Sequence, residues 1–151
     1  MLNDRVLAII DLKRIWENCN KIRDIIPEHC KIMAVVKANA YGHGAVEVTR
    51  YLEDKGIKHF AVACIDEAIE LREAGINSEI LILGYTKQDR VSLLKKYNLT
   101  QTVFSYQYAE KLNDANTLIK THIKIDTGMS RVGFYCHKNE DIKDCITKIK
   151  K

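Results

Sequence analysis

The sequence has few features of an exported or membrane-embedded protein. It contains one proline, no apolar run long enough to span a bilayer, and no signal-peptide pattern in its first residues. We therefore expect a cytoplasmic protein that does not enter a membrane. Its five cysteines are odd in number and form no C-x-x-C pair. That pattern favours free thiols over a disulfide framework or a zinc site, and no metal is expected.

Aromatic residues are also scarce, at 7% of 151 residues, and the formal net charge is only +4. The positive residues are scattered. The lysine-rich segment 143–151 has no interleaved aromatics, which is typical of a solvated helix face. No nucleic-acid partner is therefore expected. The hydrophobic content of 46% is sufficient for a packed core in one domain.

Strand-like apolar runs alternate with amphipathic helical patterns along the chain. A leading strand at about residues 5–11 and a helix ended by Pro27 come first. Apolar runs without polar alternation, such as residues 60–64 and 80–84, predict strands buried on both faces of a parallel sheet. Five βα units are expected after the leading strand, and their strands lie near Val35, Val62, Ile82, Val103 and Ile123.

This order of elements predicts an α/β protein of the (β/α) TIM-barrel type. A closed barrel of this kind has eight βα units and about 250 residues. We therefore expect residues 1–151 to form one incomplete barrel domain with about five of the eight units, in which parallel strands have helical cover.

One apolar strand ends in a lysine. Residues 32–36 are apolar, Lys37 follows, and a polar, glycine-containing turn leads to a helix from about Ala45. Burial at a strand end favours the neutral amine, which can form a Schiff base with an aldehyde cofactor. The carboxyl end of a strand is also where α/β folds place their chemistry. The alternative is a lysine whose ammonium group reaches solvent from the strand end.

A second polar cluster follows a later strand. Lys124 lies in an apolar strand, Asp126 begins the turn after it, and Arg131 comes next. Two cations share a neighbourhood only if an anion lies between them or one is neutralised. The guanidinium of Arg131 suits a phenolate or a carboxylate, and Asp126 suits stabilisation of its turn. The alternatives are a Lys124 that faces water and an Arg131 in a surface ion pair.

Both stretches resemble the alanine racemase family, whose members use pyridoxal 5′-phosphate (PLP) on a barrel-type fold. The similarity extends along nearly the whole chain, including residues 61–68 and 71–76. Basic amino-acid decarboxylases share only the Val-Lys-Ala-Asn core, so the extension beyond it favours the racemases. The two motifs are Val36-Lys37-Ala38-Asn39-Ala40-Tyr41-Gly42-His43-Gly44 and Lys124-Ile125-Asp126-Thr127-Gly128-Met129.

The resemblance implies roles for individual residues. Lys37 holds PLP through a Schiff base and serves as one catalytic base. Tyr41 points toward the cofactor phosphate, and Leu83 forms a wall of the cofactor pocket. Lys124 is carbamylated and orients Arg131, which contacts the phenolic oxygen of PLP and the substrate carboxylate. For Tyr41 and Leu83 the alternatives are a half-buried aromatic with a solvated hydroxyl and an ordinary core residue.

The resemblance also implies an isomerase that interconverts L-alanine and D-alanine, supplies D-alanine for peptidoglycan, and is a homodimer in its full-length form. The family's second base lies in a C-terminal β domain that this sequence lacks. We therefore expect a truncated chain that is weakly active or inactive alone. Three alternatives stay open: a serine or broad amino-acid racemase of the same family, a truncated non-catalytic PLP-binding protein, and a single-domain PLP homeostasis protein, which the two motifs disfavour.

Overall fold

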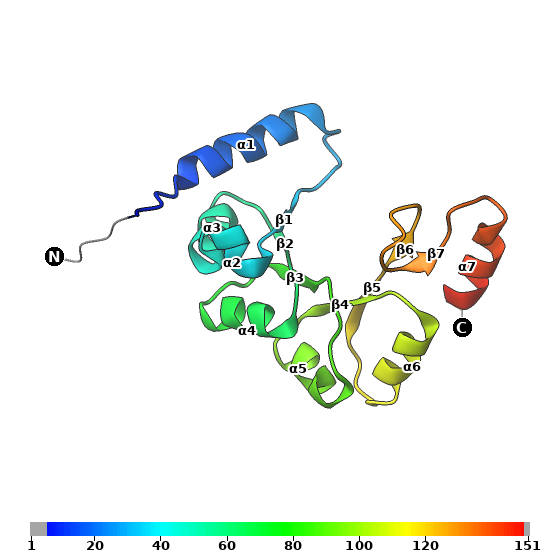
Figure 1. Ribbon diagram of the computed structural model, residues 1–151. Helices are drawn as coiled ribbons and strands as arrows, with labels where there is room; N and C mark the ends of the chain where they lie inside the picture. Colours follow the sequence, from blue (N-terminus) through cyan, green and yellow to red (C-terminus); the bar gives the residue numbers. More distant parts are fainter. Residues whose placement is uncertain (1–5, 150–151) are drawn as a thin grey trace.

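The computed structural model describes residues 6–149, which contain one five-stranded sheet with helices along one side (Figure 1). Every neighbouring pair of strands in this sheet is parallel. The predicted α/β architecture, with five strands of an incomplete barrel, is therefore confirmed. In their order across the sheet the strands are β1 (Met33–Val35), β2 (His59–Val62), β3 (Glu79–Ile82), β4 (Thr100–Val103) and β5 (Lys120–Ile123).

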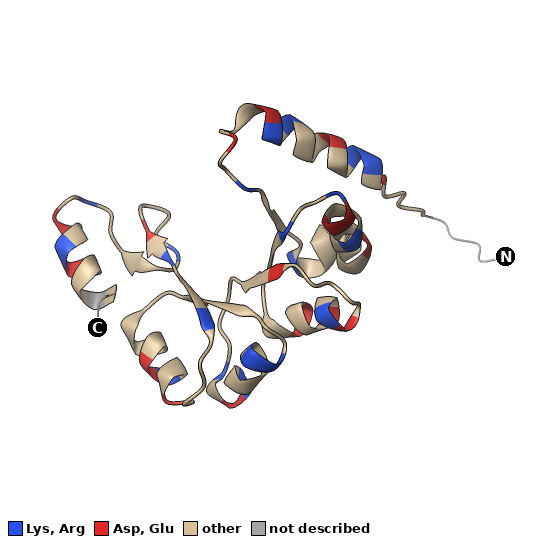
Figure 2. Cartoon of the chain, turned by 180° about the vertical axis from the view of Figure 1, so that it is seen from behind, with Lys and Arg blue, Asp and Glu red and all other residues tan. Residues whose placement is uncertain are grey.

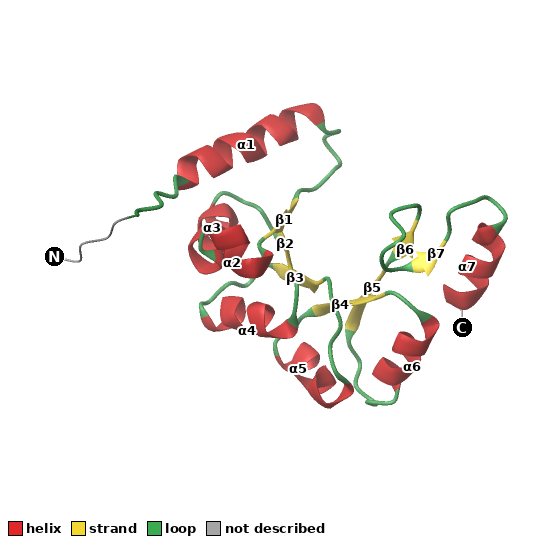
Figure 3. Ribbon diagram, in the orientation of Figure 1, coloured by secondary structure: helices red, strands yellow, loops and turns green. Residues whose placement is uncertain are grey.

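Helices connect the strands, and further elements precede and follow the sheet (Figure 3). Of the helices that the structure describes, none combines the length and the hydrophobicity needed to cross a bilayer. The connecting helices are α2 (Lys37–Gly42), α3 (Ala45–Asp54), α4 (Ile65–Glu73), the 3₁₀ turn η1 (Gln88–Arg90), α5 (Val91–Lys96) and α6 (Tyr106–Asn113). The outer elements are α1 (Leu12–Ile25), the paired short strands β6 (Ile125–Asp126) and β7 (Phe134–Tyr135), and α7 (Asp141–Ile149).

Local sequence signals explain several helix boundaries. The side chain of Asp11 accepts the backbone N–H groups of Lys13 and Arg14, and α1 then ends before Pro27, as predicted. The hydroxyl of Ser105 accepts the N–H of Tyr108 at 3.2 Å. Side-chain caps of this kind satisfy N–H groups that have no partner within the helix, so they fix where α1 and α6 begin.

The core lies between the sheet and helices α3 to α6. Strand register aligns Ala34 with Phe60 and Phe60 with Ile80, so these side chains share one face. Phe60 and Ile80 have no exposed surface. In Figures 1 and 2 the same helices follow one side of the curved sheet, and their charged residues are spread along the outer surface. One face of the sheet is therefore a packed core.

The opposite face of the sheet is partly open. On β1, Met33 and Val35 are 37% and 42% exposed, although Ala61, which pairs with Val35 on β2, is buried. All four residues of β5 are exposed. The predicted burial on both faces at residues 60–64 and 80–84 holds for residues 60–62 of β2, whereas Leu81 of β3 is half-buried. A parallel strand is buried on both faces only where elements cover both.

The predicted leading strand at residues 5–11 is wrong over its described part. Residues 6–11 belong to no strand, and Val6, Leu7 and Ile9 are 87%, 74% and 83% exposed. A strand forms only where a neighbouring strand supplies hydrogen-bond partners. Between residues 6 and 149 the sheet places no such strand beside this segment, and residue 5 lies outside the described residues.

Arg72 joins the loop before β3 to the loop before β4. Its guanidinium donates to the carbonyl oxygens of Tyr97 (2.9 Å), Ile76 (2.8 Å), Ser78 (2.7 Å) and Asn98 (3.0 Å). Burial lowers the pKa of this guanidinium below its ordinary value. Because both loops bind the same guanidinium, Arg72 fixes the position of α4 relative to β3 and of α5 relative to β4.

Glu53, near the end of α3, supports the same loop before β3. One of its carboxylate oxygens accepts the N–H groups of Asn77 (3.1 Å) and Ser78 (2.7 Å). Burial acts to raise the pKa of Glu53, but the hydrogen bonds from Ser78 and Asn77 and the charge of Lys58 outweigh it and lower that pKa.

We expect Arg72→Met to reduce the free energy of unfolding by about 3 kcal/mol, because carbonyl oxygens of both loops lose a charged donor. Arg50→Met is the matched control, since Arg50 donates only one exposed hydrogen bond, to Ala74. It should cost about 0.5 kcal/mol or less. Urea unfolding followed by circular dichroism measures both variants, and equal losses would contradict the role of Arg72.

Glu53→Gln should make the free energy of unfolding depend less on pH in the acid range. A carboxyl with a lowered pKa contributes stability above its unfolded-state pKa and loses that contribution as the pH falls through the folded-state pKa. The urea midpoint of the wild-type chain should therefore fall more steeply below about pH 5 than that of the variant. The control Glu17→Gln, at an exposed position on α1, should leave the wild-type slope in place.

Candidate functional site

Lys37 stands at the carboxyl end of β1 and begins a turn of unusual handedness. The next four residues, 38–41, have φ values of 51°, 54°, 52° and 55°, so the short helix α2 is left-handed. The sequence analysis predicted a turn here but not its hand. For residues with a Cβ this conformation costs about 1 kcal/mol or more per residue. Contacts from elsewhere in the fold must therefore hold it.

Glu67 supplies the main long-range contact. Its two carboxylate oxygens accept the N–H of Ala38 (2.8 Å) and the N–H of Ala63 (2.7 Å). One side chain on α4 thus joins the residue after Lys37 to the end of β2. At the other end of the turn, the side chain of Asn39 accepts the N–H of Ala45 (2.7 Å) and starts α3. The sequence analysis missed Glu67, whose only local signal is an acidic residue in the first turn of a helix.

Lys37 itself is half-buried rather than enclosed. Its Nζ lies 6.0 Å from the ring centroid of Tyr41, which is 61% exposed. Among residues 6–149, no carboxylate forms an ion pair with Lys37. The predicted burial is therefore wrong, because the sheet face at the edge strand β1 has little cover. The half-buried lysine has no carboxylate within ion-pair distance in the described chain to hold it as an ammonium, which favours reaction with an aldehyde.

Leu83 lies at the carboxyl end of β3, between the positions of Lys37 and Lys124 in the strand order. The N–H of Leu83 bonds to Val62 (2.9 Å), and that of Gly84 bonds to Ala63 (3.0 Å). A Cβ on Gly84 would lie 2.6 Å from the Ala63 oxygen, so only glycine allows this approach. The half-buried side chain of Leu83 has the position of a wall at this end of the sheet.

Lys124 and Arg131 belong to a folded-back loop after β5. The N–H of Lys124 bonds to Val103 (2.8 Å), and the Lys124 oxygen accepts the N–H of Phe134 (2.8 Å). A Cβ on Gly133, whose φ is 138°, would lie 2.7 Å from a backbone nitrogen of β6. The loop 127–133 therefore returns tightly to the strand end, where Lys124 is half-buried and Arg131 is exposed.

Asp126 stabilises the loop 127–133, as its predicted turn role requires. One carboxylate oxygen accepts the N–H groups of Gly128 (3.1 Å) and Ser130 (3.0 Å). The hydrogen bond from Gly128 is the largest influence on the pKa of Asp126, which lies below its ordinary value. His137 Nε2 is 3.2 Å from the same oxygen. The sequence analysis did not select His137.

The predicted site residues therefore form two groups at one end of the sheet. Lys37 and Tyr41 lie at β1, and Lys124 and Arg131 lie at β5. Three strands separate the two groups, and Leu83 ends the middle one. The parallel sheet brings all five residues to its carboxyl end but does not bring the β1 group into contact with the β5 group.

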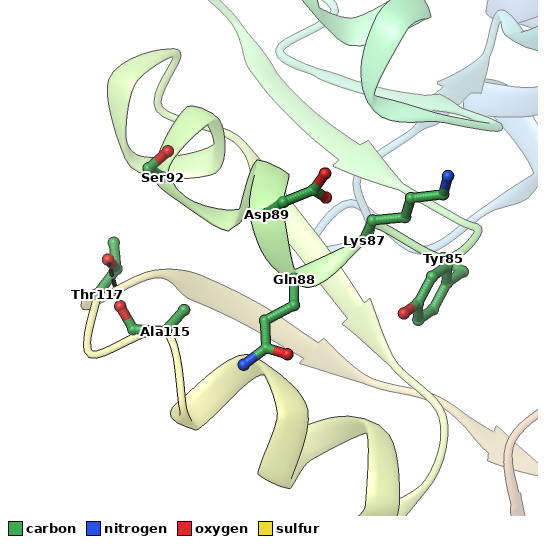
Figure 4. A pocket seen from close by; sticks show the side chains of 7 residues that line it. All are labelled: Tyr85, Lys87, Gln88, Asp89, Ser92, Ala115 and Thr117. Carbon is green, nitrogen blue, oxygen red and sulfur yellow. Dashed lines mark hydrogen bonds between the residues drawn. The ribbon is translucent and has the colours of Figure 1, made fainter.

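A hollow of about 780 Å³ lies elsewhere (Figure 4). It is bordered by the segment after β3, which carries Tyr85 and Lys87, and by the loop between α6 and β5, which carries Ala115 and Thr117. The hydroxyl of Thr117 bonds to the oxygen of Ala115 within that loop (3.0 Å). None of the five predicted site residues borders the hollow, so it is distinct from the candidate site.

Known proteins are similar to this chain in both sequence and fold. An amino-acid racemase of Enterococcus faecalis is 50% identical over 139 residues, which cover 92% of this chain and 20% of that protein. Alanine racemase 1 of Clostridium acetobutylicum is 50% identical over 133 residues, which cover 85% of this chain and 34% of that protein. A solved alanine racemase of Clostridium difficile has a TM-score of 0.80 at 39% identity, and the match covers 93% of this chain and 38% of that one.

The similarity involves only part of each relative. Curated relatives are matched over 17% to 39% of their own length, from a serine/alanine racemase of Enterococcus gallinarum to an alanine racemase of Carboxydothermus hydrogenoformans. The family model described as "Alanine racemase, N-terminal domain" matches residues 10–151, almost the whole sequence. With this match, and with a parallel sheet that carries the motif lysine at its carboxyl end, the chain belongs to the alanine racemase N-terminal domain family.

Proposed function

We propose that this chain supplies the cofactor-attachment part of a PLP-dependent alanine racemase, with Lys37 as the attachment residue. The observation that carries the proposal is a half-buried lysine with no ion-pair partner among residues 6–149, at the carboxyl end of a parallel sheet and at the head of a left-handed turn. Strained backbone persists where the surrounding structure holds it, and it concentrates at functional sites. Membership of the family supplies the reaction class.

The residues at the sheet end fit such a cofactor in their chemistry. When bound, PLP draws electrons from the α-carbon of an amino acid and makes its proton removable. Lys37 Nζ would hold the cofactor and, once the amino group of the substrate has displaced it, would be a free amine able to accept or return a proton on one side of that carbon. The Tyr41 hydroxyl suits the cofactor phosphate, and Leu83 provides an apolar wall. The guanidinium of Arg131 suits the substrate carboxylate.

Lys124 has a supporting role in this proposal. As an ammonium it would repel Arg131, which lies in the loop that folds back onto the strand end carrying Lys124. After losing a proton, the Lys124 amine would add to carbon dioxide and release a second proton to solvent; the resulting carbamate is an anion and would orient the guanidinium. The half-buried position of Lys124 supports this role, because an unpaired charge is costly there and a carbamate beside the guanidinium would be paired.

Alanine is the proposed substrate, and a full-length homodimer that supplies D-alanine for peptidoglycan from the cytoplasm is the proposed setting. The name of Alanine racemase 1 of Clostridium acetobutylicum supports alanine. The alternative within the family is a serine or broader amino-acid racemase, which the less specific name of the Enterococcus faecalis relative supports. Competition between L-alanine and L-serine in a racemisation assay distinguishes the two.

A second candidate function is PLP binding without turnover. The open sheet face supports it, since Val35 beside the site is 42% exposed. Racemisation requires proton transfer on both sides of the substrate carbon in a site that excludes water. A site that admits water can still hold the cofactor on Lys37.

Lys37→Ala tests the attachment. With added PLP, the wild-type chain should develop a visible absorbance band that borohydride removes, and peptide mass spectrometry should find the reduced adduct on Lys37. The variant should lose both signals because the reacting amine is gone. Lys31→Ala, which changes an exposed lysine before β1, should keep both. Absence of an adduct on wild-type Lys37 would overturn the proposal.

Conversion of L-alanine to D-alanine by the same preparations separates the two candidate functions. Turnover that Lys37→Ala abolishes supports the racemase. An adduct on Lys37 without turnover selects the binding protein.

Glu67→Gln should slow formation of the Lys37 adduct several-fold. Glutamine offers one acceptor oxygen where the carboxylate uses two, so the N–H of either Ala38 or Ala63 loses its partner and the left-handed turn loosens. Glu70→Gln on the exposed side of α4 is the matched control and should react at the wild-type rate. Equal adduct rates in both variants would show that Glu67 does not position Lys37.

A further inference from the structure

We propose that His137 is a positioning residue for the loop 127–133: its charged imidazole acts through Asp126 to hold the loop segment that carries Arg131. The consequence for Arg131 rests on the function proposed above. The effect on the loop itself does not, and it can be measured without any cofactor.

Asp126 is the point at which the loop is held. Its Oδ1 receives the N–H groups of Gly128 and Ser130, and its backbone oxygen receives the N–H of Cys136 at 2.9 Å. Ser130 has a left-handed φ of 56° and directly precedes Arg131. The direction in which the chain enters Arg131 therefore depends on where the Asp126 carboxylate lies.

His137, two residues after β7, lies close to that carboxylate. Its Nε2 is 3.2 Å from Asp126 Oδ1, and the histidine side chain is 20% exposed. This nitrogen is buried, and among the described residues it has no partner in line for a hydrogen bond. The contact is therefore an electrostatic pair whose strength depends on the charge of the ring. The imidazole also lies against the ring of Tyr135, at a centroid distance of 4.0 Å.

The backbone of His137 is held independently of its ring. The N–H groups of His137 (3.0 Å) and Lys138 (2.8 Å) both bond to one oxygen of Asp141, at the start of α7. A change in the charge of the ring can therefore alter the pair with Asp126 without releasing His137 from its place.

The ionisable groups around His137 come from several elements. Within the described chain, only Asp126 is within 4 Å of the imidazole as an ion-pair partner. Lys138 and Glu140 pair with each other at 3.6 Å. The titratable groups in contact with His137 or next to it in the chain are Asp126 of β6, Tyr135 of β7, Cys136, Lys138, and Asp141 of α7.

The sign of the effect follows from these charges. The hydrogen bond from Gly128, followed by the one from Ser130 and by the nearby imidazole of His137, holds the pKa of Asp126 below its ordinary value, so the carboxylate stays charged into the acid range. The stability that it contributes is lost only as the pH falls through that lowered pKa. A protonated ring gives the carboxylate an opposite charge at 3.2 Å, and a neutral ring does not, so the loop is held most firmly while both groups are charged.

An NMR titration of the ¹⁵N-labelled full chain without cofactor tests the inference. The backbone amide signals of Gly128 and Ser130 should shift with the same midpoint as the imidazole signals of His137. His137→Gln should abolish that shift. Asp126→Asn keeps an acceptor oxygen for the two N–H groups but removes the negative charge, so the amides should no longer follow His137. His122→Gln, at an exposed position on β5, should preserve the wild-type shift.

The inference is overturned if the amide signals of Gly128 and Ser130 do not shift with the midpoint of His137 in the wild-type chain. It is also overturned if they still shift at that pH in His137→Gln. The wild-type titration needs no substitution, so it remains decisive if a variant fails to fold. PLP labelling of Lys37 is a separate measurement: normal labelling without coupled amide shifts refutes the role of His137 alone, and coupled shifts without labelling refute the proposed function alone.

Discussion

The carboxylate of Glu67 connects the first two strand ends, and the candidate site depends on that connection. Its two oxygens are shared between Ala38, which follows Lys37, and Ala63, which follows β2. Four consecutive left-handed residues would not persist without such a contact, because each one costs conformational energy. The bond spans 29 positions of sequence, so the tertiary fold, and not the local segment, holds Lys37 in its place.

The second constraint is the one-sided cover of the sheet. Helices α3 to α6 pack on one face, while β1 keeps exposed residues on the other face and all four residues of the edge strand β5 are exposed. Lys37 is half-buried and Arg131 is exposed, and the two groups of site residues lie at one end of the sheet but at opposite edges. The parallel sheet thus places each site residue at the carboxyl ends of the strands, and the curvature and helical cover of the sheet determine what surrounds it.

The loop after β5 shows how a short motif depends on residues outside it. Asp126 belongs to the motif and receives N–H groups from within the loop, as its sequence pattern predicts. His137 lies eleven positions later, outside the motif, and reaches the same oxygen only because β6 pairs with β7. A side-chain contact that forms only when two strands pair cannot be predicted from the local sequence.

Much of the fold was readable from the sequence. The periodic apolar residues predicted the order of helices and strands, and Pro27 marked a helix end that the structure keeps. Five of the candidate site residues could be named, and they lie at the carboxyl end of the sheet as expected. These features depend on local patterns of hydrophobicity and charge, which the order of residues alone contains.

Tertiary contacts decided the hand of the turn after Lys37, the partial exposure of Lys37, the role of Glu67 and the absence of a strand at residues 6–11. Each of those depends on which distant residue supplies a hydrogen bond or covers a surface, and that is settled only when the chain is folded.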